Sequence, residues 1–176
     1  MYSTEIGTAR IDFTIEPIRK AMVEAEPLLH DHLSNLDPPL GHRVTLRPDL
    51  YGDIEDAGVL LCFVARCAGE MIGYCTVMYD YALHAPDEKH ANVDAVYLDP
   101  DCRWGPLAGR FLSWIDSELA ARGVVQVFHA CPAGRDYGKV LARRSGYRMI
   151  QRVYTRRLGG EDGESREEHR EGPGIR

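Results

Sequence analysis

Two long apolar runs, separated only by a short polar turn, place the strongest constraint on the fold of this chain. The runs cover residues 59–65 (VLLCFVA) and 71–81 (MIGYCTVMYDY), and residues 66–70 form the turn. Two such runs joined this closely predict a β-hairpin. Because both runs are apolar at successive positions, each strand is expected to be buried on both faces of its sheet. The hairpin therefore predicts a central sheet with helices on each side.

The segments before the hairpin predict one strand and two or three helices. Residues 10–16 (RIDFTIE) alternate in polarity and predict a short strand. In residues 17–36 apolar side chains recur at helical spacing, and Pro27 within this run predicts a kink or two successive helices. Residues 36–58 are rich in Pro, Gly and Asp, and they predict only a short helix after Pro48.

The second half of the chain predicts alternating strands and helices. A helix can begin at Pro106, because the first turn does not use the N–H that proline lacks. Apolar residues then form a stripe along this helix, and Gly123 ends it. The other expected elements are a polar loop at 86–89, a third strand at 93–98, a buried strand at 124–130, a short helix at 135–144 ended by Gly146, and one or two strands at 147–158.

This order of elements predicts one α/β domain with a mixed sheet and helices on both faces. We expect the domain to span residues 10–158. The remaining residues, 159–176, contain a single hydrophobic side chain, Ile175. Such a segment cannot bury enough apolar area to offset its ordering entropy, so a disordered charged tail is expected.

Composition argues against several classes of function. A net charge of −6 is unsuited to coating nucleic acid. No apolar run approaches the ~18 residues that cross a bilayer, and the first residues lack the features of a secretory signal. We therefore expect no nucleic-acid or membrane partner and a cytoplasmic location. The five cysteines form no CxxC pair, so no metal site is predicted.

Residues 96–110 (VYLDPDCRWGPLAGR) are the stretch most suggestive of chemistry. A strand ends, a turn of small residues follows, and an amphipathic helix begins directly. The unbonded N–H groups and the dipole at the start of such a helix attract phosphate oxygens. Gly105, Ala108 and Gly109 keep the backbone uncovered, and Arg103 and Arg110 add positive charge. The segment predicts a site for a phosphate-bearing ligand.

The same segment resembles the acetyl-CoA signature of the GCN5-related N-acetyltransferases, Arg/Gln-x-x-Gly-x-Gly/Ala after a strand. Arg103, Leu107 and Ala108 match this pattern, with Leu98-Asp99-Pro100 ahead of it, and Pro106 stands where the pattern has its middle glycine. The resemblance covers about residues 13–158 and includes the hairpin and the Ser-Gly-Tyr at 145–147. The ending VYTRRL looks most like a subgroup often encoded by tailed bacteriophages.

The resemblance implies a mostly antiparallel sheet whose third strand bulges and splays from its neighbour. It further implies acetyl-CoA as co-substrate and direct attack by an amine, with no nucleophilic cysteine. One phosphate contact at Pro106 is expected to be lost or to move to a neighbouring N–H. The residues expected to bind acetyl-CoA are Val96, Tyr97, Leu98, Arg103, Trp104, Gly105, Leu107, Ala108, Gly109 and Arg110.

A protonated amine must lose a proton before it attacks, so a base is expected near the thioester. Asp94 is the first candidate, on the strand expected to bulge, and its alternative role is a carboxylate satisfied by nearby backbone N–H groups or Arg. His84 is a second candidate, with His30, His32 and His90 as further ones; lone histidines are more often surface or packing residues.

A general acid is expected to protonate the departing thiolate. Family members often use a Tyr on the helix before the final strands, where Ala142 stands here. Tyr137, more than a turn earlier, and Tyr154, on a late strand, are the candidates. Water or a helix dipole can also assist the thiolate.

The function predicted is transfer of an acetyl group from acetyl-CoA to a primary amine of a small molecule or protein. Acidic residues in 37–58 and 84–91 favour a cationic acceptor. The alternative is a weak or inactive member of the fold, acting as a CoA-binding regulator or as a phage structural or host-interaction protein. A hydrolase using Cys131 is disfavoured because no adjacent base is visible. A homodimer is possible.

Overall fold

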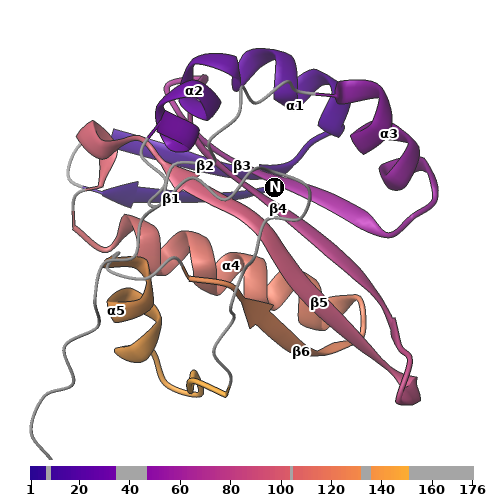
Figure 1. Cartoon of the computed structure of the whole chain (residues 1–176). Coiled ribbons are helices and arrows are strands. Elements are labelled where there is room, and N and C mark those ends of the chain that lie inside the picture. Colours follow the sequence, from indigo (N-terminus) through magenta and orange to yellow (C-terminus); the bar gives the residue numbers. More distant parts are fainter. Residues whose placement is uncertain (7–8, 35–46, 104, 132–135, 151–176) are drawn as a thin grey trace, which may run out of the picture.

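A single mixed sheet forms the centre of the molecule. The computed structural model describes residues 1–6, 9–34, 47–103, 105–131 and 136–150. Within these residues six strands lie in the order of the chain, antiparallel from the first to the fifth, with the sixth parallel to the fifth (Figure 1). The strands are β1 (Tyr2–Ile6), β2 (Ala9–Ile15), β3 (Leu60–Cys67), β4 (Glu70–Ala82), β5 (Ala85–Leu98) and β6 (Val124–His129). The predicted mixed, mostly antiparallel sheet is confirmed.

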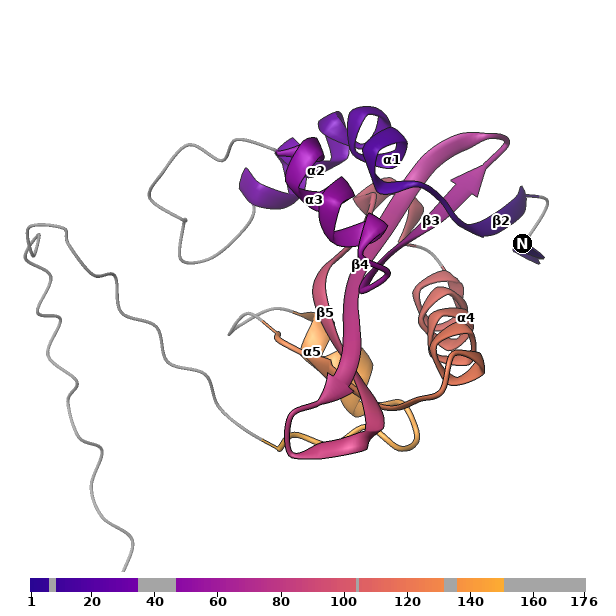
Figure 2. The same cartoon turned by 90° about the vertical axis from the view of Figure 1, so that its right-hand side faces the viewer.

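Helices cover both faces of this sheet, as predicted. Three lie on one face: α1 (Ile18–Glu24), α2 (Glu26–Ser34) and α3 (Pro48–Asp56). On the other face lie α4 (Leu107–Ala121) and α5 (Asp136–Ala142), and a short 3-10 turn, η1 (Pro100–Cys102), connects β5 toward α4. The two layers of helices are seen on opposite sides of the sheet in Figures 1 and 2.

The larger part of the apolar core lies between the sheet and α4. The predicted stripe of α4 is buried, and Trp114 packs its ring 5.6 Å from Phe13 of β2 and 5.5 Å from Phe63 of β3. A second cluster lies under α1 on the opposite face and includes Ile18 and Met22. Apolar side chains on both faces explain why the middle of the hairpin reads as continuously hydrophobic.

The predicted interruption of the first helical run is also present. Helix α1 ends at Glu24, and Ala25 separates it from α2. Pro27 is the second residue of α2, in the first turn, where its missing N–H removes no helical hydrogen bond. The short helix expected after Pro48 is α3.

The structure adds a strand before residue 10 and extends the hairpin beyond its expected end. Strand β1 precedes the predicted boundary at residue 10, and it is held by Tyr2, whose ring stacks on Phe13, and by the buried Ile6. Residues 86–89 are strand rather than loop, because the polar end of β5 continues to pair with β4. This end of the hairpin has few buried side chains, which explains its polar sequence.

The last predicted elements are only partly described. The expected strand at 124–130 is present as β6, but it is only partly buried: Val124 is 8% exposed and Val125 is 64% exposed. Among the described residues it lies at the edge of the sheet. Residues 147–150 form no strand, Gly146 has a positive φ of 86° after α5, and residues 151–158 and 159–176 lie outside the described residues.

Candidate active site

Strands β5 and β6 separate halfway along β5. They pair from Lys89 opposite Val124 to Val93 opposite His129. Beyond that point, residues 95–98 pair only with β4 among the described strands. Figure 1 shows β5 continuing past the end of β6 toward η1. The other side of the backbone at 95–98 therefore faces no strand among the described residues, at the place where the resemblance implied a splay.

A β-bulge lies where the splay begins. Thr76 pairs with Ala95, whereas Val77 pairs with Val93, which leaves Asp94 as the extra residue. An extra residue reverses the alternation of side chains between the two faces. Accordingly, Val93 and Val96 both contact the core on the α4 face, and Ala95 contacts the cluster beneath α2. The bulge directs Asp94 toward the side of α1 and α3.

The unpaired backbone groups of β5 can be assigned from the alternation of hydrogen bonds. The Asp99 N–H donates to the Ile72 carbonyl at 2.8 Å, so the N–H and C=O of Tyr97 also face β4. Those of Val96 and Leu98 then face the splay. The Leu98 carbonyl accepts from Arg103 Nε at 2.7 Å, and the Arg103 guanidinium lies 5.1 Å from the centre of the Tyr97 ring.

Helix α4 begins close to the splay with its first N–H groups uncapped. Pro106 is the N-cap, no side chain caps the helix, and the first turn contains no acidic residue. Gly105 adopts a φ of +58°, which a glycine tolerates without strain. Because Pro106 precedes the helical residues, the N–H groups of Leu107, Ala108 and Gly109 have no partner within α4, and no side chain of the described residues caps them.

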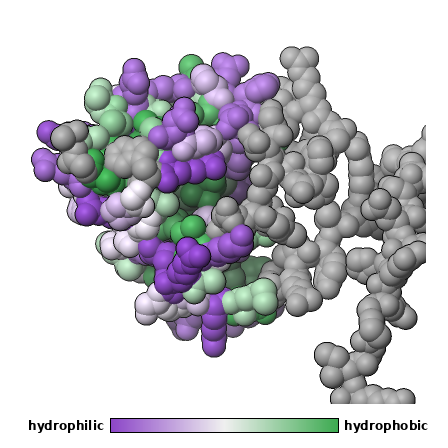
Figure 3. Space-filling view, turned by 90° about the vertical axis from the view of Figure 1, so that its left-hand side faces the viewer, coloured by the Kyte–Doolittle hydropathy of each residue, from purple (hydrophilic) through white to green (hydrophobic). Residues whose placement is uncertain are grey.

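The two arginines expected at this helix start are already engaged. Arg110 Nη1 donates to the Glu5 carbonyl at 2.8 Å and to Thr4 Oγ1, and so ties α4 to β1. Arg103 lies over Tyr97. Trp104 lies outside the described residues. Figure 3 views the end of the molecule where α2 and the start of α4 lie, and hydrophobic surface gathers there in a hollow between hydrophilic regions.

A pocket adjoins the bulge on the side of α1, α2 and α3. Its cavity volume is about 40 Å³, and it is partly open to solvent. Asp94 lies at its wall, where Thr76 Oγ1 donates to Asp94 Oδ2 at 3.1 Å. The pKa of Tyr51 is raised, first by burial and then by the nearby Asp94 carboxylate. Burial also raises the pKa of the Cys62 thiol in this pocket to about 12, so that thiol is not a nucleophile.

On the α4 side, Tyr137 belongs to a chain of polar contacts at the point where the splay opens. Its hydroxyl shares a 2.5 Å hydrogen bond with Nδ1 of His129, the residue opposite Val93. His129 Nε2 lies 3.4 Å from the Tyr147 hydroxyl, which donates to Asp116 Oδ1 at 2.8 Å. Burial raises the pKa of Tyr137 and lowers that of His129. At neutral pH this combination keeps the phenol protonated and the imidazole neutral.

The other histidines named from the sequence lie in different places. His84 is exposed at the turn between β4 and β5, ten residues from Asp94 and thus about 30 Å away along an extended strand. His90 contacts Glu88 at 3.3 Å, and His30 is exposed. His32 Nδ1 and the Tyr74 hydroxyl share a 2.7 Å hydrogen bond behind the pocket. In the structure, neither His84 nor His90 lies beside Asp94.

Sequence reasoning did not single out Tyr51, Tyr74, Thr76 or His129. Thr76 had one readable signal, a polar residue within the apolar run of β4. No group of three or more His, Cys, Asp or Glu side chains in the described part of the chain could hold a metal ion. No helix in that part is long and apolar enough to cross a membrane.

Solved structures of N-acetyltransferases share this fold. The ribosomal-protein-alanine N-acetyltransferase of Brucella melitensis biovar Abortus 2308 matches with a TM-score of 0.64 at 19% identity, over 85% of this chain and 99% of that one. An aminoglycoside acetyltransferase from a soil metagenome, in complex with sisomicin, matches with a TM-score of 0.65 at 11% identity, over 84% and 95%. The aminoglycoside N-acetyltransferase AAC(6')-Iy in complex with CoA matches with a TM-score of 0.61 at 17% identity, over 85% and 95%.

No family model and no curated protein sequence matches the chain. At these identities the structural likeness establishes the fold alone. The predicted fold of the GCN5-related N-acetyltransferases is confirmed.

Proposed function

We propose that this protein transfers an acetyl group from acetyl-CoA to a primary amine by direct attack. The observation that carries the proposal is the splay between β5 and β6, which opens beside the uncapped start of α4. An open strand edge can pair with the amides of pantetheine, and a helix start can bind a diphosphate. The likeness to acetyltransferases, one of them in complex with CoA, supports the same assignment.

Acetyl-CoA would be held mainly by backbone groups. The free N–H and C=O of Val96 and the N–H of Leu98 would pair with the pantetheine arm. The N–H groups of Leu107, Ala108 and Gly109 would bind the diphosphate. Pro106 does not weaken this set, because it lies before the donors rather than among them. Arg110 is occupied by β1 and would contribute only its positive charge.

In the proposed reaction the amine nitrogen attacks the thioester carbon, and the carbon–sulfur bond breaks as the amide forms. Asp94 would take a proton from the ammonium, held toward the pocket by its hydrogen bond from Thr76. The Tyr137 hydroxyl would give a proton to the departing CoA thiolate, and the second proton that the amine nitrogen loses as the amide forms would restore the phenol through solvent. His129, neutral and hydrogen-bonded to that hydroxyl, would position it. His84 has no part in this scheme.

A substitution at Pro106 tests the cofactor assignment without removing structure. Pro106→Asp places a carboxylate beside the free N–H groups. Its interaction with the helix dipole stabilises the helix by up to about 1 kcal/mol, but its negative charge repels a diphosphate. We expect acetyl-CoA to bind at least tenfold more weakly in calorimetric titration, with unchanged or raised thermal stability. Pro106→Gly, the matched variant, restores the glycine of the family pattern and should bind at least as tightly as the parent.

If the parent, Pro106→Asp and Pro106→Gly bound acetyl-CoA with equal affinity, the start of α4 would not be part of the binding site. The absence of CoA release with every amine, despite tight acetyl-CoA binding, would instead favour a CoA-binding regulator. Several expectations stay predictions. They are the relationship to a phage-encoded subgroup, a role in phage structure or host interaction, the cytoplasmic location, the homodimer and the exclusion of nucleic acid.

A further inference from the structure

We infer that the acceptor is a monoamine, a single primary ammonium carried on a compact apolar body. The inference rests on the proposed acetyl transfer and narrows its substrate class. It follows from the pocket beside Asp94, which offers a ligand one carboxylate and otherwise mainly hydrocarbon among the described residues.

Apolar side chains from several elements line the pocket. Ile18 and Met22 of α1 are 1% and 6% exposed, and Leu29 of α2 and Ala95 of β5 also belong to the lining. Contacts of this kind gain free energy only from apolar surface, at about 25 cal/mol per Å² buried. They give no hydrogen bond to a hydroxyl or a second ammonium.

The polar groups that reach the pocket are already paired with one another. The Tyr74 hydroxyl shares its hydrogen bond with His32, and Thr76 donates to Asp94. Burial first, and then the same carboxylate, raises the pKa of Tyr51, whose hydroxyl lies close to that carboxylate. Asp94 is the one charged side chain among the described residues that line the pocket, so it can neutralise one ammonium group.

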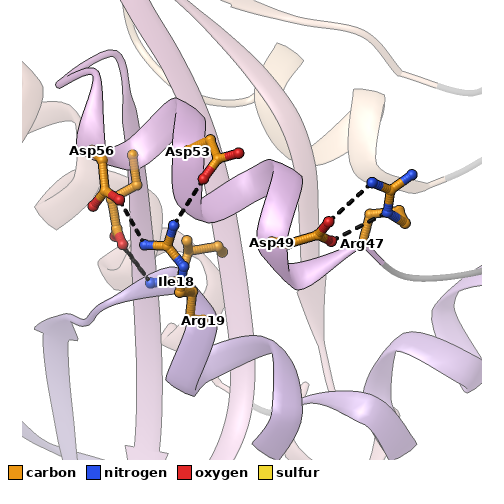
Figure 4. A network of polar contacts seen from close by, with 7 residues as sticks. Ile18, Arg19, Arg47, Asp49, Asp53 and Asp56 are labelled. Atoms are coloured by element: carbon orange, nitrogen blue, oxygen red, sulfur yellow. Dashed lines mark hydrogen bonds and ion pairs between the residues drawn. The ribbon is translucent and has the colours of Figure 1, made fainter.

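The acidic residues of α3, which the sequence offered as a cation-attracting surface, do not supply a second such group. Arg19 bridges Asp53 at 3.0 Å and Asp56 at 2.9 Å. Arg47 pairs with Asp49 at 2.9 Å, as Figure 4 shows. The Glu55 carboxylate accepts the Ile18 N–H at 2.9 and 3.1 Å. These carboxylates fasten α3 to α1 and to its own start.

Against the described lining of the pocket, polyamines and aminosugars would therefore bury groups without partners. An unsatisfied polar group costs about 1–3 kcal/mol, and an unpaired ammonium costs more. A monoamine avoids this cost because its one charge meets Asp94 and its remaining atoms meet the apolar walls. The pocket thus selects against the class of ligand, sisomicin, that is bound to one structural neighbour.

The test compares amines that differ by one charge. CoA release from saturating acetyl-CoA is measured with butylamine, 1,4-diaminobutane, 2-phenylethylamine and sisomicin. We expect kcat/KM for butylamine to exceed that for 1,4-diaminobutane by about 10-fold to 100-fold, and we expect no release above background with sisomicin.

Two matched variants locate the selectivity in the pocket. Met22→Ala enlarges the apolar wall and should shift preference at least threefold from butylamine toward 2-phenylethylamine. Val23→Ala, on the same helix but 69% exposed, should leave the ratio unchanged. Thermal melting of both variants identifies any loss of folding, and the diamine comparison on the parent protein does not depend on either variant.

Faster turnover of 1,4-diaminobutane or sisomicin than of either monoamine would overturn the inference and leave acetyl transfer intact. An unchanged amine preference in folded Met22→Ala would also overturn it. Failure of acetyl-CoA to bind, or of every amine to release CoA, would instead overturn the proposed function and the inference with it.

Discussion

The bulge in β5 divides two flanks that are built in different ways. The CoA flank consists of the splay beside β6 and the start of α4, and its proposed contacts are backbone N–H and C=O groups. The acceptor flank is the pocket beneath α1 and α3, and its contacts are side chains from several elements.

This difference matters for how each flank responds to substitution. Backbone donors survive most changes of side chain, so we expect the CoA flank to tolerate sequence variation such as Pro106. The proposed contacts of the acceptor flank are single side chains, Asp94 above all, so we expect a one-residue change there to alter both rate and substrate. The two flanks should therefore be separable by mutation.

The largest expected effect is at Asp94, and it tests that separation directly. Asp94→Asn removes the proposed base but keeps the shape of the side chain and its contact with Thr76. We expect kcat/KM for the best amine to fall about 100-fold or more at neutral pH, with the Kd for acetyl-CoA unchanged. Stopped assays of CoA release and calorimetric titration provide the two measurements.

Asp87→Asn is the matched control, because Asp87 lies on the same strand but is exposed near the end of the hairpin. It should change neither quantity. Unaltered turnover in Asp94→Asn would exclude the residue as the base, and a large rise in the acetyl-CoA Kd would show that the flanks are coupled.

The backbone arrangement of the CoA flank could be anticipated because its parts lie in one continuous stretch. Residues 96–110 contain the strand end, the turn and the helix start, and each has a local signal in glycine, proline and apolar spacing. The engagement of Arg110 could not be anticipated in the same way. Its partners lie on β1, more than a hundred residues away and before the expected start of the domain.

The acceptor flank illustrates the limit of sequence reasoning. Tyr51, Thr76 and Asp94 meet only because α3 folds over the sheet and because β4 and β5 adopt one register. A shift of one residue in that register would turn the side chains to the other face. Neither the register nor the packing of α3 has a local signature. The resemblance suggested Asp94, but its neighbours became visible only in three dimensions.

A smaller effect is expected on the CoA flank from Tyr137→Phe. Loss of the phenol removes the proposed acid, and kcat should fall about 10-fold to 100-fold, while KM for the amine changes little. Tyr81→Phe, a change of the same kind at an exposed position of the hairpin, is the control. Thermal melting is needed beside the rates, because removing a buried hydroxyl that contacts His129 can itself cost about 1 kcal/mol.

A variant Tyr137→Phe that is folded and fully active would leave the thiolate to depart without help from this residue. In that case the polar chain from His129 to Asp116 would be a structural feature of the CoA flank, and only the acceptor flank would contain a catalytic side chain.

The smallest effect compares one buried histidine from each flank. Burial lowers the pKa of His32, beside the acceptor pocket, and of His129, beside the splay. As the pH falls below an ordinary histidine pKa of about 6.5, these two side chains bind protons more readily in the unfolded chain than in the folded one. Stability should therefore fall as the pH decreases from about 7 to 5. The contribution of each is a fraction of a kcal/mol, because both rings are partly screened by solvent.

Urea unfolding at pH 7 and pH 5 of His32→Gln and His129→Gln measures these contributions separately. Each variant should lose less stability over this interval than the parent, and His84→Gln, at the exposed turn, should behave as the parent does. Hydrogen bonds from Arg66 are the main cause that lowers the pKa of Glu16 and Glu24. These two carboxylates do not contribute to the change in stability between pH 7 and pH 5. Their contribution is lost only below the ordinary value of 4.5. If only one histidine variant flattens the pH dependence, that flank alone excludes water from its histidine, and the other flank is the more open of the two before any ligand binds.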